Sequence, residues 1–310
     1  MSRSPVVQSP TIAICIPSYN HANFLAGCIE SVLAQDARPD EFIVRDDCST
    51  DGTWERLASY REELLVLRNT VNVGIAKNYD RLLRDATSDY VVLLSSDDLL
   101  HSSFVRRVRR QLGNAQCVVT GCLHIGPTGH LSKKSRYHGI SYLRWRHRSR
   151  SDLTAAVCRG SIFSFPGSAW ERSWLLSLPA LPSEAGLCVD WYWQILTAAY
   201  GAYRFDPLPL HCYRYHSANA SHSAQRTWQE HAVRMLTFLL DEKLIPREFE
   251  AHLSQSLDRL RYELDEGPAV AAVGNQGTKS RVARSIADSV LSWGMRKAFW
   301  RAQGVQVHDC

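Results

Sequence analysis

The sequence predicts an α/β protein built on a mostly parallel, doubly wound sheet. In the first 112 residues, short apolar runs alternate with segments of helical periodicity, the pattern of strand–helix–strand units. Residues 90–94 are apolar without a break, as expected of a strand buried on both faces. Asp97 and Asp98 follow this run directly, and ligand sites in such sheets lie beyond the carboxyl ends of strands.

The elements of the first half follow from these patterns. Apolar runs predict four strands, at 11–16, 41–44, 64–67 and 90–94. Apolar residues at helical spacing predict helices at 24–33, 54–58 and 75–86. Turn and capping residues gather at 46–52, after the second strand.

The pattern is looser after residue 112. Further strands are predicted at 117–120, 161–165, 203–205 and 211–215, with a hairpin turn at 126–129. An aromatic-rich helix is predicted at 189–200, with Asp190 near its start. From residue 227 the sequence is helical, including a segment at 280–303. We therefore expect one domain over 1–225, with halves at about 11–112 and 113–225, and a helical region over 226–310.

Composition describes an ordinary globular protein. The chain has 310 residues, 45% of them hydrophobic and 22% charged, with a net charge of +5. Its bases are concentrated in one segment, which is either a solvated loop or an anion-binding surface: Lys133, Lys134, Arg136, Arg144, Arg146, Arg148 and Arg150. Nine scattered cysteines without a C-x-x-C motif predict reduced thiols in a cytoplasmic protein. No signal peptide or membrane span is expected.

Two common phosphate-binding signatures are missing. Residues 17–21 after the first strand are not a G-x-G-x-x-G loop, and no G-x-x-x-x-G-K-[ST] motif occurs. Phosphate would then be held by acidic residues through a divalent metal, which makes Asp97 and Asp98 candidate ligands. The alternative is that one of them caps a helix starting near His101.

Four stretches, in order, resemble family 2 glycosyltransferases with the GT-A fold. They are Ile14–Asn20 (I-C-I-P-S-Y-N), Val44–Thr53 (V-R-D-D-C-S-T-D-G-T), Asn72–Gly74 with Lys77 and Asn78, and Leu94–Asp98 (L-S-S-D-D). Close similarity covers about residues 11–112, and looser similarity reaches about residue 221. The first acidic position of the family's L-D-S-D-D motif is Ser95 here.

The resemblance implies a nucleotide-sugar site. The donor would be bound by Pro17, Tyr19, Asn20, Asp46, Asp47, Asn72, Gly74, Lys77, Ser96, Asp97, Gly167 and Arg214. A carboxylate in the 46–47 loop suits the ring N–H of uracil or thymine. Mg²⁺ or Mn²⁺ would be held by Asp97, Asp98 and His216 and would neutralise the departing diphosphate. Residues 213–221, with Arg214 and His216, resemble the family's Y-R-x-H-x-x-N-x-S segment.

The acceptor hydroxyl needs a general base. Residues 188–193, C-V-D-W-Y-W, resemble the family's E-D or D-W motif, with Val189 in place of glutamate. The resemblance therefore implies that Asp190 is the catalytic base. We expect its pKa to be raised by the neighbouring aromatic residues. Helix capping by Asp190 is the alternative, and the two roles are compatible.

The expected function is inverting, metal-dependent transfer of a sugar, from a UDP- or dTDP-sugar, to an acceptor hydroxyl in bacterial surface polysaccharide assembly. The acceptor would be a glycan or a lipid-linked molecule, and nucleic acid is not an expected partner. Residues 285–301 combine bases with tryptophans, which suggests peripheral contact with the inner face of a membrane; packing on the protein is the alternative. One alternative is a degenerate transferase that acts as a nucleotide-sugar-binding or scaffolding subunit, which Ser95 and Val189 favour. A second alternative, a nucleotidyltransferase, would need a glycine-rich basic loop after the first strand, and residues 17–21 do not form one.

Overall fold

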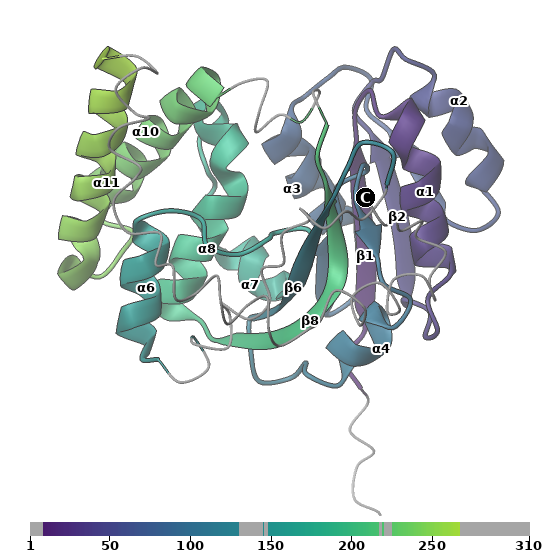
Figure 1. Cartoon of the computed structure of the whole chain (residues 1–310), viewed down its shortest axis with the longest axis horizontal. Helices are drawn as coiled ribbons and strands as arrows, with labels where there is room; N and C mark the ends of the chain where they lie inside the picture. The colour runs from purple at the N-terminus through teal and green to yellow at the C-terminus, as the bar shows by residue number, and fades with distance from the viewer. Residues whose placement is uncertain (1–8, 130–144, 146–147, 217–218, 220–224, 267–310) are drawn as a thin grey trace, which may run out of the picture.

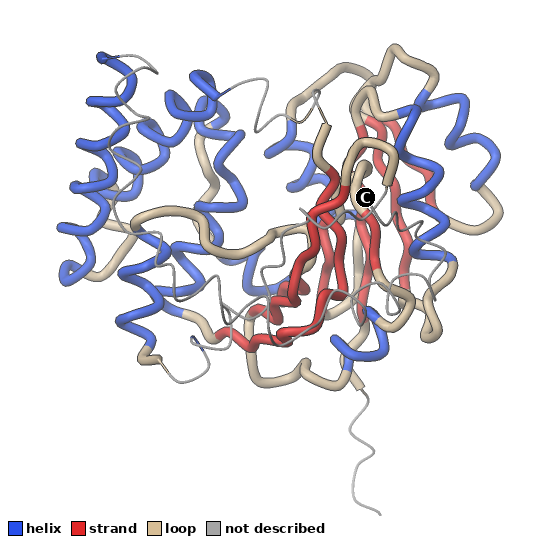
Figure 2. Tube along the Cα trace, in the orientation of Figure 1, coloured by secondary structure: helices blue, strands red, loops and turns tan. Residues whose placement is uncertain are grey.

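The computed structural model describes residues 9–129, 145, 148–216, 219 and 225–266. Its centre is one curled eight-stranded sheet with helices on both faces (Figures 1 and 2). The strand order is β3-β2-β1-β4-β7-β6-β8-β5. The predicted α/β class with a helical C-terminal part is confirmed.

The strands fall into two groups. Four parallel strands form the first half of the sheet: β1 (Ile12–Ser18), β2 (Glu41–Asp46), β3 (Leu65–Arg68) and β4 (Tyr90–Leu93). The second half is mixed: β5 (Leu99–Leu100), β6 (Cys117–Ile125), β7 (Ser168–Glu171) and β8 (Tyr203–Arg214). Strand β7 is antiparallel to both of its neighbours, β4 and β6, so it joins the two groups.

The helices follow the strands along the chain. In the first half they are α1 (Ala22–Leu33), α2 (Thr53–Leu57), the 3-10 turn η1 (Ala58–Tyr60), α3 (Ile75–Asp85) and α4 (Phe104–Arg109). In the second half they are α6 (Arg150–Cys158), α7 (Arg172–Ser177), the 3-10 turn η3 (Ser183–Cys188), α8 (Val189–Tyr200), α10 (Gln225–Asp241) and α11 (Arg247–Glu266).

Alternate residues of β1 supply two separate cores. Ile14 and Ile16 pack with α1, α2 and α4 on one face, whereas Ala13 and Cys15 face α3 and α8 on the other. Successive strand side chains point to opposite faces, so an apolar run without polar interruptions is what a doubly covered strand requires. Helices α10 and α11 contribute to the second of these cores, and they pack against η3 and α6 on the α8 side of the sheet.

Two sequence predictions in the second half are wrong. The strand expected at 161–165 lies instead at Ser168–Glu171, because Gly167 and Ser168 approach β6 and continue the ladder. The two short strands expected at 203–205 and 211–215 are one strand, β8, with an irregularity opposite Gly121. A Cβ on Gly121 would lie 2.6 Å from the carbonyl oxygen of Leu208, so glycine permits this bulge.

Helix capping by Asp97 or Asp98 is excluded. Helix α4 begins only at Phe104, and its N-cap residue is Ser103. The segment 280–303 and most of the basic segment 133–150 lie outside the described residues. Within the described part of the chain, no helix is long and apolar enough to cross a membrane.

Candidate active site

The candidate site lies at the carboxyl ends of β1, β2 and β4. The loops after these parallel strands carry residues 18–21, 46–52 and 94–98, which therefore meet at one edge of the sheet. Strand β8 pairs antiparallel with β5 and ends at Arg214, beside these loops. Arg214, His216 and Asn219 therefore also lie at this edge. The site thus combines segments from both halves of the chain.

Three side chains converge at the centre of this edge. His21, Asp97 and His216 each offer one ligand atom, and these atoms lie within 4.8 Å of one another. The Nε2 atom of His216 is 2.9 Å from Oδ2 of Asp97. The sequence predicted Asp97 and His216 as partners in a metal site, and the structure brings them together. His21 was not predicted, although it follows the first strand directly.

Neighbouring groups fix the orientation of each member. The Nδ1 atom of His21 is 2.7 Å from Oγ of Ser96, and the ring of Phe24 stacks on His216 with centroids 4.3 Å apart. Asn219 donates to Oδ2 of Asp97 at 3.2 Å and accepts from the backbone N–H of His216 at 2.6 Å. Burial lowers the pKa of His21, which favours the neutral imidazole that ligates metals.

The donor set fits a divalent metal. Octahedral metals with bonds of about 2.1 Å need ligand atoms roughly 3–4 Å apart, which is compatible with the observed spread. Two imidazoles and one carboxylate suit Mn²⁺ and related transition metals better than Mg²⁺, which prefers oxygen ligands.

Asp98 lies below this cluster and faces other partners. It is fully buried, accepts the backbone N–H of Arg214 at 2.8 Å, and lies 3.4 Å from Nε2 of His211. Burial, and then the charge of Asp97, raise the pKa of Asp98 well above its usual value. Asp98 is not part of the convergent group, so we interpret it as a residue that holds the end of β8 under the site.

Arg214 links the loop after β4 to the turn after β6. Its Nε donates to the carbonyl of Asp97 at 2.6 Å, and one terminal nitrogen donates to the carbonyl of Pro127 at 3.1 Å. The guanidinium also lies 5.4 Å from the ring centroid of Phe24. A Cβ on Gly129 would lie 3.0 Å from a terminal nitrogen of this guanidinium, and the φ of Gly129 is positive, so both features favour glycine there.

The carboxylate of Asp47 organises the loop that precedes α3. One oxygen accepts from the side chain of Asn69 at 2.8 Å and from the N–H of Val73 at 2.9 Å, and the other accepts from the N–H of Gly74 at 2.9 Å. Asn69 also donates to Asn78 at 2.9 Å. Asp47 was predicted to touch the donor, but its oxygens are occupied by the protein in this structure.

Asp46 differs from Asp47 in having a free oxygen. Its Oδ2 pairs with Arg68 at 3.1 Å and accepts from the N–H of Ser49 at 3.1 Å. Its Oδ1 is buried and lacks a hydrogen-bond partner in the described structure. An orphaned acceptor of this kind is costly unless a ligand donates to it. Arg68 is in turn stacked over the ring of Trp54, 4.8 Å from its centroid.

The remaining donor-side predictions lie around the same loops. Tyr19 is 44% exposed beside the 46–52 loop, and Asn20 accepts from the N–H of Thr50 at 2.9 Å. Asn72 accepts from the N–H of Gly74 at 3.0 Å. Pro17 is the half-buried, next-to-last residue of β1, and Lys77 lies in the first turn of α3.

Gly167 lies against a neighbouring side chain. Its expected role, to let a sugar approach the backbone, stays a prediction, and a Cβ on Gly167 would lie 2.7 Å from Nδ1 of His211. The residue that approaches closely is therefore His211, which fills this space beneath Asp98.

Asp190 lies in the first turn of α8, as predicted. Burial raises its pKa to about 6, although the N–H groups of Asp190 and Trp191 act in the opposite direction. Tyr79 lies within the electrostatic influence of both this carboxylate and Asp97. Burial, and then the charges of Asp190, Asp97 and Asp98, raise the pKa of Tyr79, whose side chain is hydrogen-bonded to Ser95. The charges of Asp190 and Asp97 thus both act on Tyr79.

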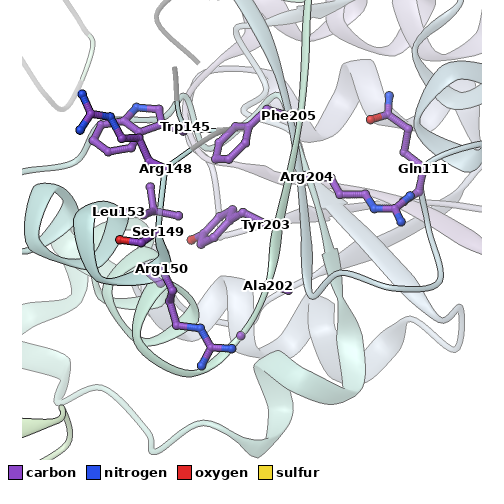
Figure 3. A pocket seen from close by; sticks show the side chains of 12 residues that line it. Gln111, Trp145, Arg148, Ser149, Arg150, Leu153, Ala202, Tyr203, Arg204 and Phe205 are labelled. Atoms are coloured by element: carbon purple, nitrogen blue, oxygen red, sulfur yellow. The ribbon is translucent and has the colours of Figure 1, made fainter. Parts of the chain in front are cut away.

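A separate cavity of about 800 Å³ lies at the opposite end of β8 (Figure 3). Its walls include Tyr203, Phe205 and the arginines 148, 150 and 204. Figure 3 shows these three guanidinium groups pointing in different directions, so they do not converge on one anion. We therefore keep the sheet edge at Asp97 as the candidate active site.

Comparison with known proteins agrees with this fold. Residues 13–173, just over half of the chain, match the sequence model of glycosyl transferase family 2. The chain therefore belongs to glycosyl transferase family 2. The family resemblance noted in the sequence is confirmed.

Curated relatives match parts of the chain. "Putative glycosyltransferase EpsE" of Bacillus subtilis is 34% identical over 124 residues, which cover 37% of this chain and 44% of that protein. The chondroitin synthase of Pasteurella multocida is 28% identical over 174 residues, covering 54% of this chain and 17% of that protein. The matches thus span less than half the length of these relatives.

Solved structures show the same fold over nearly the whole chain. The mannosyltransferase PcManGT from Pyrobaculum calidifontis, in complex with GDP-Man and Mn²⁺, has a TM-score of 0.59 at 19% identity, over 96% of this chain and 87% of that chain. Residues 1–349 of S. aureus TarS, in complex with UDP, have a TM-score of 0.56 at 16% identity, over 95% and 87%. The GT-A fold is confirmed.

Proposed function

We propose that the chain transfers a sugar from a nucleotide-diphosphate donor to an acceptor hydroxyl in a metal-dependent, inverting reaction. The convergence of His21, Asp97 and His216 beside the Asp46 loop, with Asp190 across Tyr79, carries this proposal. These residues would provide a cation site, a buried oxygen of Asp46 that could accept a hydrogen bond from the nucleobase, and the Asp190 carboxylate with its raised pKa.

The donor would be held at the edge of β1, β2 and β4. The free Oδ1 of Asp46 is suited to the ring N–H of uracil or thymine, so a UDP- or dTDP-sugar is favoured. Tyr19 offers an exposed ring beside this oxygen's loop, and Asp47 keeps the 69–74 loop in place. His21, Asp97 and His216 would hold a divalent metal, which neutralises negative charge on the leaving diphosphate.

Asp190 would take the proton of the acceptor hydroxyl. A base works best when its pKa lies close to the operating pH, and burial brings Asp190 to about 6. A single displacement by the activated hydroxyl inverts the configuration at the anomeric carbon. The proton moves to the Asp190 carboxylate as the new bond to the acceptor oxygen forms and the bond to the diphosphate breaks.

The relatives suggest the biological setting. Two are named for polysaccharides, as a teichuronic acid biosynthesis glycosyltransferase and as a chondroitin synthase. We infer that this chain acts in bacterial polysaccharide assembly on a glycan or lipid-linked acceptor. Cytoplasmic location and peripheral membrane contact through residues 285–301 stay predictions, since that segment lies outside the described residues.

The degenerate-subunit alternative rests on Ser95 and Val189. In the structure Ser95 is hydrogen-bonded to Tyr79, and Val189, the first residue of α8, is buried in the core, so both side chains have structural roles. Neither replaces Asp97 or Asp190, which keep the positions that the transferase needs.

A panel of UDP-, dTDP- and GDP-sugars tests the proposal. We expect Mn²⁺-dependent release of UDP or dTDP with one donor, accelerated by an acceptor glycan, and a product of inverted anomeric configuration by NMR. Binding of a donor without release of nucleotide under any metal condition would instead support the subunit alternative.

A further inference from the structure

Helix α10 meets the chain at the turn that immediately precedes Asp190. We propose that α10 positions Asp190 for catalysis, with Trp228 and His231 as the positioning residues. The inference rests on the proposed function, because it concerns the alignment of the proposed base. It assigns a role to the C-terminal helical region that sequence patterns do not suggest.

Three contacts join α10 to this turn, and a fourth joins it to the start of α8. Nδ1 of His231 accepts from the backbone N–H of Leu187 at 3.2 Å, and the carbonyl of Trp228 accepts from the thiol of Cys188 at 3.6 Å. The indole of Trp228 stacks on that of Trp191, with centroids 5.8 Å apart and planes 13° apart. Arg234 donates to the carbonyl of Glu184 at 3.3 Å.

These contacts bracket Asp190 in the sequence. Leu187 and Cys188 come just before it and Trp191 just after it, so the α10 contacts fix the backbone on both sides of the carboxylate. Trp191 is also anchored on its other side, since its indole N–H donates to the carbonyl of Val157 at 2.7 Å. The first turn of α8 is thereby held between α6 and α10.

The same turn η3 also contacts the donor side. A Cβ on Gly186 would lie 3.1 Å from Cβ of Ala76, in the first turn of α3, which follows the loop held by Asp47. Turn η3 therefore lies between α3 and α10. A displacement of η3 away from α10 would move Asp190 relative to the donor loops, and misplacement by about 1 Å can cost roughly 100-fold in rate.

The electrostatic surroundings suit this arrangement. Burial and then Arg234 lower the pKa of His231, while Glu230 and Glu184 oppose them, so the imidazole keeps an unprotonated Nδ1 to accept from Leu187. Tyr79 and Cys188 are the titratable groups on which the charge of Asp190 acts. Water that entered beside Asp190 would weaken the burial that raises its pKa.

Four variants of α10 test the proposal in the full chain. Trp228→Leu removes the stacked ring, and His231→Leu removes the acceptor for Leu187. His231→Asn keeps an acceptor oxygen near the position of Nδ1. Phe238→Leu is the matched control, because Phe238 lies on the same helix and contacts Tyr192, with ring centroids 6.4 Å apart, away from η3.

We expect kcat to fall about 10- to 100-fold in Trp228→Leu and His231→Leu, with the donor KM within twofold of wild type. His231→Asn should recover most of the rate. In Trp228→Leu the acid limb of the kcat profile should move to lower pH. Hydrogen exchange of the peptide covering 183–191 should rise in His231→Leu but not in Phe238→Leu, which reports on the turn without any activity.

The proposal is overturned if the two leucine variants lose no more activity than Phe238→Leu, or if His231→Asn is as slow as His231→Leu. Faster exchange at 183–191 with unchanged kcat would also overturn it. Should Trp228→Leu fail to fold, the two His231 variants decide. Asp190→Asn separates this result from the proposed function: if that variant keeps wild-type turnover, Asp190 is not the base and both statements fall.

Discussion

Nε2 of His216 lies 2.9 Å from Oδ2 of Asp97, across 119 residues of sequence. The contact joins the loop after β4 to the end of β8, and it brings the two halves of the chain to one point. With His21, the pair forms the group that could hold a metal.

Asp97→Asn should lower Mn²⁺ affinity at least about 100-fold, because the substitution removes the anionic ligand while keeping the side-chain shape; even groups outside the ligand set change metal affinity by 10- to 100-fold. Titration calorimetry with Mn²⁺ in the presence of UDP measures the effect. Asp80→Asn, at an exposed carboxylate paired with Arg84, is the control. Equal Mn²⁺ affinity in the Asp97 and Asp80 variants would rule out Asp97 as a ligand.

His21→Ala should weaken Mn²⁺ binding by about 10-fold or more and Mg²⁺ binding by less, because imidazole is a better ligand for transition metals than for Mg²⁺. The wild-type protein should accordingly prefer Mn²⁺. Competition between the two ions, followed by electron paramagnetic resonance of Mn²⁺, measures this preference. His252→Ala on α11 is the control, and a loss in His21→Ala no greater than in this control would exclude His21 from the site.

Asp190→Asn should lower kcat by about 10² to 10⁴ and leave donor affinity roughly unchanged, as expected for loss of a general base. Single-turnover rates and donor titration separate the two quantities. A collapse of donor affinity would place Asp190 in the nucleotide site instead.

The pH dependence should report the same carboxylate. A base with a pKa of about 6 is protonated below that value, so kcat should fall about tenfold per pH unit on the acid side and level off above pH 7. An acid limb near pH 4, the ordinary range of aspartate, would show that Asp190 is not desolvated during turnover.

Asp190 should also reduce stability at neutral pH. Its folded pKa of about 6 exceeds the 3.8 of an unperturbed aspartate, so the folded state is progressively destabilised as pH rises from about 4 through 6, and by a constant amount above pH 6. This difference in pKa corresponds to roughly 3 kcal/mol, an upper value because the side chain is partly accessible. Asp190→Asn should therefore unfold at higher denaturant concentration than wild type at pH 8 but not at pH 4. Equal stabilities at pH 8 would contradict the raised pKa.

Asp47→Asn should raise the donor KM about tenfold with a smaller change in kcat. In wild type the backbone N–H groups of Val73 and Gly74 donate to the two oxygens of Asp47, and the amide of asparagine would place an NH₂ group opposite one of them. One hydrogen bond to a charged group would then be lost, and such a bond contributes about 1.5–3 kcal/mol. Steady-state kinetics over donor concentration measures this change. An unchanged donor KM would mean that the 69–74 loop does not contact the donor.

The first half of the fold could be predicted because its signals are local. Strands β1 and β4 are apolar at every position that faces either core, so their burial and parallel pairing follow from the run itself. Strand β7 could not be placed in the same way. Its position is set by pairing with β4 and β6, and the run at 161–165 is equally apolar.

The site shows the same division. Asp97, His216 and Asp190 stand in motifs, whereas His21 is a lone histidine whose only signal is its place after the first strand. The inward direction of Asp98 depends on Arg214 and His211, more than 100 residues away. Likewise, the space beside Gly167 is filled by His211 on a different strand, which no local pattern reveals.

We propose sugar transfer that depends on a metal held at Asp97 and on Asp190 as the base. The most direct measurement is the rate of nucleotide release from the best donor with its acceptor, before EDTA, after EDTA, and after Mn²⁺ is restored. We expect EDTA to abolish release in the wild type and Mn²⁺ to restore it, while Asp97→Asn stays inactive throughout. Undiminished release in EDTA, or wild-type release by Asp97→Asn, would contradict this proposal.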